Sequence, residues 1–204
     1  MGGRTAAGRV SVAAIASVRK RPQHASLALG QAGAGRARPP YSGGGRRMTG
    51  TQRRGRRVMM TPRELDAFLA EQRTCRVATV SEDGTPHVGP LWFVWDGAAL
   101  WLYSVTRSKR WAQLRKDPRV AVAVDDGHDY GELRGAELSG SAEIVGEVPR
   151  TGGACPELHA PERLFATKYF GLEAMPHDGR HAWLRLVPDA VVSWDFRKMG
   201  ASAG

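Results

Sequence analysis

The chain has 204 residues, a formal net charge of +10 and two cysteines. Cys75 and Cys155 form neither a CxxC motif nor a disulfide framework, which excludes a disulfide-rich secreted domain and favours a reducing, cytoplasmic location. The apolar run at residues 10–18 is too short to cross a bilayer, so we expect no membrane partner.

The positive charge is concentrated at the N-terminus. Residues 1–57 contain 13 of the 30 Lys and Arg residues and none of the 20 acids, so residues 58–204 carry 17 basic and 20 acidic side chains, a formal charge of −3. The basic pI therefore belongs to the first part of the chain. For the remainder we expect no specific nucleic-acid partner.

Residues 1–57 are predicted to be a disordered basic leader. They are rich in Gly, Ala, Arg and Ser and have no hydrophobic period, so they bury too little apolar surface to offset their ordering entropy. A signal-like segment, an organelle transit peptide, and translated sequence upstream of a start at Met48, Met59 or Met60 are the three interpretations. The last is favoured, because the first strong helix signal follows Met60.

The elements expected after Met60 begin with a helix. Thr61-Pro62-Arg63-Glu64 is a capping box with proline at N1, and apolar residues follow at helical spacing, which predicts a helix over residues 62–73. Two strands, at residues 75–81 and 86–95, are separated by a hairpin turn at residues 82–85. A third strand is expected at residues 98–105.

The second half of the chain continues this pattern. A helix opens at Ser108 and ends before Pro118, and a strand of alternating valines covers residues 120–124. A fifth strand and a later helix precede two final strands, at residues 182–187 and 190–196. In the fifth strand the residues expected on one face are Ala136, Leu138, Ala142 and Ile144, and the later helix is expected at residues 161–171. Residues 58–204 therefore predict one mainly β domain, a six- to seven-stranded β-barrel with flanking helices.

The corner after the third strand carries the strongest functional signal. Lys109 and Arg110 lie in the first turn of the helix, where cations oppose the helix dipole, and hydroxyl groups accompany them. Cations, hydroxyls and free backbone N–H groups at one helix start are typical of an anion site, and a phosphate is the obvious ligand. The alternative is a solvated basic turn.

Several motifs together resemble one family. They are the Thr-Val-Ser-Glu-Asp-Gly-Thr-Pro-His-Val hairpin of residues 79–88, the aromatic strand after it, the Ser-Lys-Arg corner, and Leu-Arg-Lys-Asp-Pro-Arg-Val at residues 114–120. This order resembles the split-barrel flavin and deazaflavin proteins, the superfamily named for pyridoxamine 5′-phosphate oxidase. The resemblance covers about residues 62–198. Residues 193–198 resemble the actinobacterial branch that uses coenzyme F-420.

The resemblance implies an FMN-binding-like split barrel that forms a homodimer, with cofactor sites at the subunit interface. It places the cofactor ring, held largely by backbone groups, along Val88, Gly89, Pro90, Leu91, Trp92 and Phe93. It places the cofactor phosphate near Ser104, Thr106, Ser108, Lys109, Arg110 and Gln113. The third strand, apolar on both faces with Trp101 and Tyr103 opposite the leucines, favours a dimer as well.

The implied function is hydride transfer from a reduced deazaflavin to an unsaturated small molecule. The alternatives are an FMN-dependent pyridoxamine phosphate oxidase-like enzyme and a non-catalytic protein that binds a flavin, deazaflavin or tetrapyrrole. The oxidase's C-terminal arginine motif is not matched by residues 197–200. His87 is the one candidate catalytic residue, as a proton donor; a hairpin histidine that packs or faces water is the alternative.

Two further patterns have structural interpretations. Trp92, Trp95 and Trp101 suit either an aromatic substrate pocket or a core. The Asp-Asp-Gly-His-Asp run at residues 125–129 is read as a polar turn, so no metal site is predicted.

Overall fold

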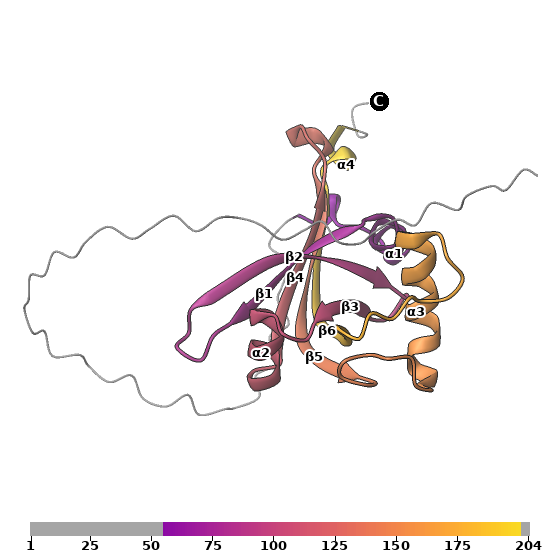
Figure 1. Ribbon diagram of the computed structural model, residues 1–204. Helices are drawn as coiled ribbons and strands as arrows, with labels where there is room; N and C mark the ends of the chain where they lie inside the picture. The colour runs from indigo at the N-terminus through magenta and orange to yellow at the C-terminus, as the bar shows by residue number, and fades with distance from the viewer. Residues whose placement is uncertain (1–54, 201–204) are drawn as a thin grey trace, which may run out of the picture. The chain divides into compact units, whose positions relative to one another are not determined.

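The structure, a computed structural model, describes residues 55–200, which form a closed six-stranded barrel with flanking helices (Figure 1). The strands are β1 (Thr74–Val80), β2 (Pro86–Trp95), β3 (Leu100–Val105), β4 (Arg119–Asp126), β5 (Arg134–Val145) and β6 (His181–Asp195). They follow the order β1-β2-β3-β6-β5-β4, and β4 returns to β1. Every neighbouring pair is antiparallel, which confirms the predicted mainly β split-barrel class.

The helical elements cover the barrel at several places. They are α1 (Pro62–Glu71), α2 (Lys109–Lys116), α3 (His159–Phe165), the π-helical turn η4 (Ala166–Phe170), α4 (Arg197–Gly200), and three 3-10 turns, η1 (Arg56–Val58), η2 (Tyr130–Glu132) and η3 (Pro156–Leu158). In Figure 1, α2 and α3 lie on different sides of the barrel. None of these helices is long and apolar enough to cross a membrane.

Helix α1 begins as its sequence predicts. The Thr61 hydroxyl accepts from the Glu64 N–H at 3.3 Å, and the Glu64 carboxylate accepts from the Thr61 N–H at 2.7 Å. The helix ends at Glu71, two residues earlier than expected. Its buried Phe68 and Leu69 join the barrel interior, so the capping box fixes the start of an element that closes the core.

The barrel interior is one apolar cluster. Inward-facing strand residues such as Val77, Leu102 and Val122 meet Trp111 and Leu114 from α2. Burying side chains of this size stabilises the fold by about 1.5–3 kcal/mol each. This packing anchors α2, and with it the predicted anion corner, against the barrel.

A second apolar layer lies outside the barrel, between β3, β6 and α3. Trp101 and Tyr103 are 3% and 7% exposed. Phe165 of α3 packs edge-on against Trp183, with 5.4 Å between the ring centres. Both faces of β3 are therefore covered within one chain. The two-sided apolar pattern of this strand does not support a dimer, contrary to the argument from the sequence.

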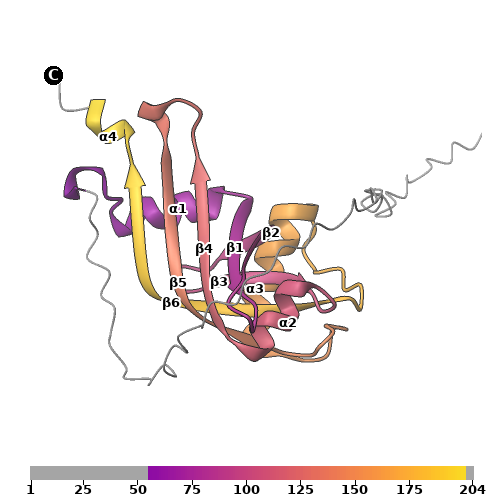
Figure 2. The ribbon, with the colours of Figure 1, turned by 90° about the vertical axis from the view of Figure 1, so that its left-hand side faces the viewer.

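The two final strands expected from the sequence are one strand, β6. Its ladder with β5 shifts register where Ser139 pairs with Ala190 and Gly140 pairs with Pro188, so that Asp189 is an extra residue. Proline lacks the N–H that a regular ladder needs, and a bulge accommodates it without ending the strand. Figure 2 shows β4, β5 and β6 running side by side beyond the barrel toward α4.

Two further expectations need detail. Ile144 shares a face of β5 with Ala142, as expected, but it is 39% exposed, whereas Val145 on the opposite face is 4% exposed because the layer beneath α3 covers the end of β5 there. The helix expected at residues 161–171 begins at His159 and changes to π geometry from Ala166.

Most of the predicted leader lies outside the residues that the structure describes. At its end, residues 56 and 57 belong to η1, and the next residue, Val58, is 7% exposed. The described part of the chain therefore includes the last three residues of the predicted leader.

Candidate functional site

Strand β2 changes partner at Phe93. Its residues 86–92 pair with β1, from Val80 opposite Pro86 to Thr74 opposite Trp92. Pairing with β3 covers only residues 93–95 of β2. The β3-facing edge of β2 before Phe93 therefore has no ladder partner in the described part of the chain. This opening is the split of the barrel, and it leaves backbone donors and acceptors for a ligand with a polar edge.

The open segment of β2 has two unlike faces. His87, Gly89 and Leu91 are partly buried and lie opposite the buried β1 residues Thr79, Val77 and Cys75. The outer face carries Val88, Pro90 and Trp92, with Val88 66% exposed and Trp92 45% exposed. The predicted ring-binding residues thus divide between an inner and an outer face, and Phe93 is buried.

Arg110 lies on the inner side of the split. Its side chain is buried, its Nη2 is 3.5 Å from the Ser104 hydroxyl, and a Cβ atom added at Gly89 would lie 3.3 Å from its Nη1. Residues from α2, β3 and β2 therefore meet here, as the resemblance implies for a cofactor site.

Arg110 is a buried cation without a counter-ion among residues 55–200. Its Nε has no hydrogen-bond partner there, and no carboxylate forms an ion pair with it. Burial lowers the pKa of Arg110, and burial raises the pKa of the neighbouring Cys75 thiol to about 12, so that thiol supplies no negative charge. A buried charge without a counter-ion is costly, and beside an open strand edge it points to an anionic ligand.

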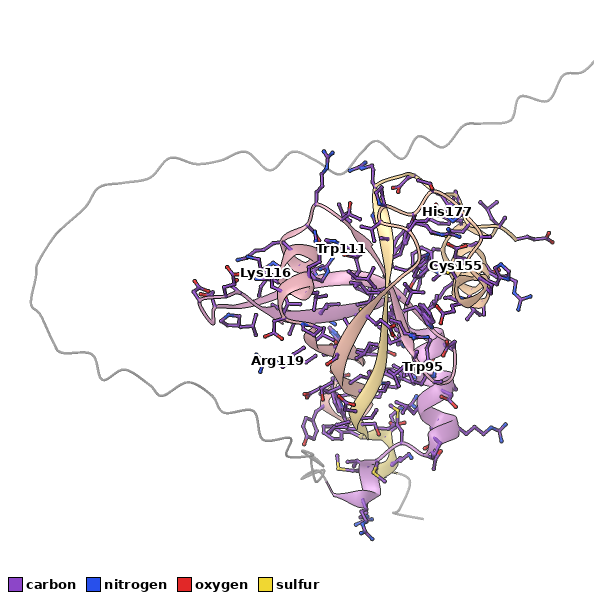
Figure 3. The ribbon with its side chains drawn as sticks, turned by 90° about the horizontal axis from the view of Figure 1, so that it is seen from below. Trp95, Trp111, Lys116, Arg119, Cys155 and His177 are labelled. Carbon is purple, nitrogen blue, oxygen red and sulfur yellow. The ribbon has the colours of Figure 1, made fainter. Side chains whose placement is uncertain are left out.

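Lys109 does not share this position. It is exposed and lines a separate open groove of about 460 Å³ between α2 and the β1–β2 turn. Lys116 and Arg119 line the same groove, and Figure 3 shows both on that side of the barrel. The two cations of the predicted clamp therefore face different spaces.

Other residues of the predicted clamp are engaged elsewhere. The Ser108 hydroxyl caps α2 by accepting from the Trp111 N–H at 3.1 Å. The Thr106 hydroxyl donates to the Arg180 carbonyl at 3.1 Å. Gln113 accepts from the Thr79 hydroxyl at 2.6 Å and donates to Ser81 at 2.5 Å. Of the predicted phosphate residues, the structure brings Arg110 and Ser104 together at the split.

His87 lies beside the same point of β2. Its Cε1 would be 3.7 Å from a Cβ atom at Gly89, and its Nδ1 is buried without a hydrogen-bond partner in the described region. His87 and Arg110 thus flank Gly89, each with an unpaired nitrogen. An anionic or polar ligand would supply the missing partners.

Sequence reasoning missed Lys168 and Tyr169 of η4, which contact β2 at Phe93. The Lys168 ammonium donates to the Gln72 carbonyl at 2.5 Å and lies 3.5 Å from the Phe93 carbonyl oxygen. Burial and the nearby Arg73 lower the pKa of Lys168 to about 8. No local sequence signal connects these residues to β2, because the contact depends on how α3 folds back.

The acidic run at residues 125–129 makes no metal centre in the structure. Asp125 forms an ion pair with Arg76, and Asp126 forms one with Arg134 at 2.7 Å. Within residues 55–200 there is no group of three or more His, Cys, Asp or Glu side chains that could hold a metal ion.

Comparison with known proteins gives a consistent family. A conserved hypothetical protein from Mycobacterium tuberculosis is 32% identical, with 72% of this chain and 91% of that chain covered and a TM-score of 0.61. An F420 reductase is 26% identical over 62% of this chain and 94% of its own, with a TM-score of 0.48. An FAD-binding protein from Mesorhizobium loti is 23% identical over 66% of this chain and 92% of its own, with a TM-score of 0.50.

A search of curated proteins gave no match. The family model described as pyridoxamine 5′-phosphate oxidase matches residues 61–195, which include all six strands, Arg110 and the open edge of β2. This chain belongs to the pyridoxamine 5′-phosphate oxidase family.

Proposed function

We propose that this protein is an oxidoreductase that binds a flavin-type cofactor at the split of the barrel and transfers hydride to an unsaturated small molecule. The observation that carries the proposal is the buried, unpaired Arg110 beside Gly89, on the inner side of the open edge of β2. Coenzyme F-420 is the preferred cofactor, because residues 193–198 resemble the deazaflavin-using branch, and FMN is second.

The residues at the split fit such a group. Arg110 and the Ser104 hydroxyl would hold a negatively charged or electron-rich part of the cofactor, since a charge-assisted hydrogen bond is the strongest that a side chain offers. Gly89 leaves space beside Arg110, and the free backbone edge of β2 would orient a planar ring. When bound, a reduced deazaflavin supplies the hydride, and the protein supplies orientation and shelter from water.

His87 is the candidate proton donor. A hydride added to a conjugated carbon leaves a carbanion-like product that takes up a proton, and an imidazole near neutral pH performs such a transfer. Its position next to Gly89 and the unpaired Nδ1 support this role.

A homodimer is part of the proposal, on a different surface from the one first expected. The outer face of the β1–β2 ribbon exposes Val80, Val88 and Trp92, which are 41%, 66% and 45% exposed, and Pro90 lies between the last two. The register places Ala78 opposite Val88, so the apolar strip continues across both strands. A contiguous apolar face of this kind suits a second copy of the chain.

The alternative is a protein that carries a flavin, deazaflavin or tetrapyrrole without turnover. It is favoured by the small number of acid–base groups at this point: among residues 55–200, a Cβ atom added at Gly89 would meet only His87 and Arg110 within 4 Å.

The test is a titration of the purified full chain with coenzyme F-420 and with FMN, followed by turnover of the reduced cofactor with a panel of conjugated ketones and quinones. An enzyme oxidises the reduced cofactor only when substrate is present. A carrier binds without turnover. Failure to bind either cofactor would overturn the oxidoreductase and a flavin or deazaflavin carrier, and a parallel titration with haem tests the tetrapyrrole carrier.

A further inference from the structure

The Tyr169 hydroxyl lies between two backbones that would otherwise pair. It is 2.7 Å from the carbonyl oxygens of Arg73 and Phe93, and it accepts from the Phe93 N–H at 3.1 Å. Its single hydrogen is shared between the two carbonyl acceptors. One side-chain hydroxyl thus satisfies both backbone groups of Phe93.

The register of the β1–β2 ladder shows what this hydroxyl replaces. The last pair is Thr74 with Trp92, so a continued ladder would place Arg73 opposite Phe93. The Tyr169 hydroxyl lies between these two residues instead, and from Phe93 onward β2 pairs with β3. Tyr169 is therefore a wedge: its side chain separates the β1 and β2 backbones at Phe93, the residue where β2 changes partner.

Several contacts hold Tyr169 in place. Its ring stacks on the Trp92 indole at 4.5 Å with an interplanar angle of 9°, and the Arg73 guanidinium lies 4.9 Å from the ring centre. Arg73 also donates to the Lys168 carbonyl at 2.8 Å, and Lys168 donates to the Gln72 carbonyl. The tyrosine belongs to a π-helical turn, a rare geometry that is frequent at functional sites.

We propose that Tyr169 is the positioning residue of the cofactor strand: by separating Arg73 from Phe93 it fixes where β2 leaves β1, and so sets the open edge against Arg110. This role rests on the proposed function, because it matters only if that edge binds the cofactor.

In the described strand pairing, residues 86–92 of β2 pair with β1 alone and residues 93–95 with β3 alone, so Phe93 is the pivot between two differently paired halves. Without the hydroxyl, the Phe93 N–H loses its partner, the Phe93 carbonyl keeps only the Lys168 ammonium at 3.5 Å, and the pivot loosens. Ligand contacts on preorganised groups weaken when their support shifts by a fraction of an ångström.

Tyr169→Phe in the full chain tests this role, because it removes the hydroxyl and keeps the stacked ring. The matched control is Tyr103→Phe, which removes another buried tyrosine hydroxyl, one without a hydrogen-bond partner in residues 55–200. The exchange rate of the Phe93 amide hydrogen, followed by NMR in the unliganded protein, measures how well the Tyr169 hydroxyl protects that N–H. Fluorescence titration with coenzyme F-420 and with FMN reads its effect on the site.

In Tyr169→Phe we expect Phe93 exchange to accelerate about tenfold and affinity for the cofactor that the wild type prefers to fall about tenfold, with the barrel's other amides unchanged. Tyr103→Phe should change neither quantity. If the wild type binds a cofactor and Tyr169→Phe binds it equally well, the positioning role is wrong and the proposed function stands. If the wild type binds neither cofactor, the proposed function fails first.

A second variant covers the case in which Tyr169→Phe does not fold. Lys168→Met keeps an apolar stem and removes the ammonium that holds η4 to the Gln72 carbonyl. We expect the same changes in Phe93 exchange and affinity, at about threefold, since two hydrogen bonds are lost, one of them long at 3.5 Å, rather than the three of the Tyr169 hydroxyl. No change in either quantity would also overturn the role.

Discussion

Arg110 lies directly against Gly89, so close that a Cβ atom there would be 3.3 Å from the Arg110 Nη1. Contacts this short require the neighbour to shift by a few tenths of an ångström. The β2 backbone at Gly89 therefore limits where the buried Arg110 guanidinium can lie, and a larger side chain at position 89 should move it.

Gly89→Val is expected to displace the Arg110 guanidinium and to lower cofactor affinity by at least about tenfold, because branched bulk there overlaps the anion-binding position. The measurement is fluorescence titration with coenzyme F-420 and FMN. Gly131→Val is the control, since a Cβ at Gly131 would meet nothing within 4 Å. Unchanged cofactor affinity in Gly89→Val would show that Arg110 does not hold the cofactor.

Arg110→Met, compared with Lys109→Met, should show which of the two cations contributes to cofactor affinity. It keeps an apolar stem and removes the charge, so affinity should fall by about 10- to 150-fold, the value of one charge-assisted contact of about 1.5–3 kcal/mol. The unliganded protein should be equally or more stable, because a buried unpaired charge is lost. Lys109→Met, on the exposed neighbour, should reduce affinity by less than about threefold. Equal losses of affinity in the two variants would instead support the sequence-based prediction that Lys109 and Arg110 hold the phosphate together.

The proposed dimer surface predicts an effect on mass. Val88→Glu places a charge in the exposed apolar strip of β1 and β2, and should shift the sedimentation coefficient from a two-chain to a one-chain species. Val187→Glu is the control on β6, where Val187 is 58% exposed outside that strip. A wild type that sediments as a monomer would contradict the proposal before any variant is made.

Glu147 predicts a specific loss of stability in acid. Hydrogen bonds from the Gly153 N–H, from the N–H and hydroxyl of Thr151 and from the buried Arg150 lower the pKa of its carboxyl to about 2. A carboxyl whose pKa is lower in the folded state contributes stability above pH 4.5, and that contribution disappears as the pH falls toward 2.

The measurement is the difference in unfolding free energy between the wild type and Glu147→Gln across this pH range. The difference should be constant above pH 4.5 and should approach zero near pH 2. Glu157→Gln is the control, on an exposed carboxylate 3.6 Å from Arg185. A pH-independent difference for Glu147→Gln would show that the loop does not depend on the charge.

Local signals in the sequence are enough to place most elements. The capping box at Thr61 and the hydroxyl cap at Ser108 act within one helical turn, and both helices begin where these residues predict. The corner between β3 and α2 is predicted for the same reason. Successive helix residues point about 100° apart, however, so Lys109 and Arg110 face different spaces although they are adjacent in sequence.

Features that depend on distant parts of the chain were not predictable. An apolar residue pattern on both faces of β3 is compatible with cover by a second copy of the chain and with cover by the chain's own α3. The sequence does not distinguish the two, and in the structure Phe165 of α3 covers the outer face. The contact of Tyr169 with Phe93 joins residues 76 positions apart, and no pattern at either end announces it. The bulge at Asp189 likewise depends on the register of two long strands.

The ladder between β5 and β6 is unbroken by the segment that connects them in sequence: Val145 pairs with Trp183 although residues 146–180 intervene. The barrel therefore closes without that excursion, which includes α3 and η4. A change in this segment leaves the inward-facing core intact, provided that the new segment still covers the outer face of β3. In this chain the segment contacts β2 through Lys168 and Tyr169, so we expect that exchanging it with that of a relative would change ligand selectivity more than the strand order of the barrel.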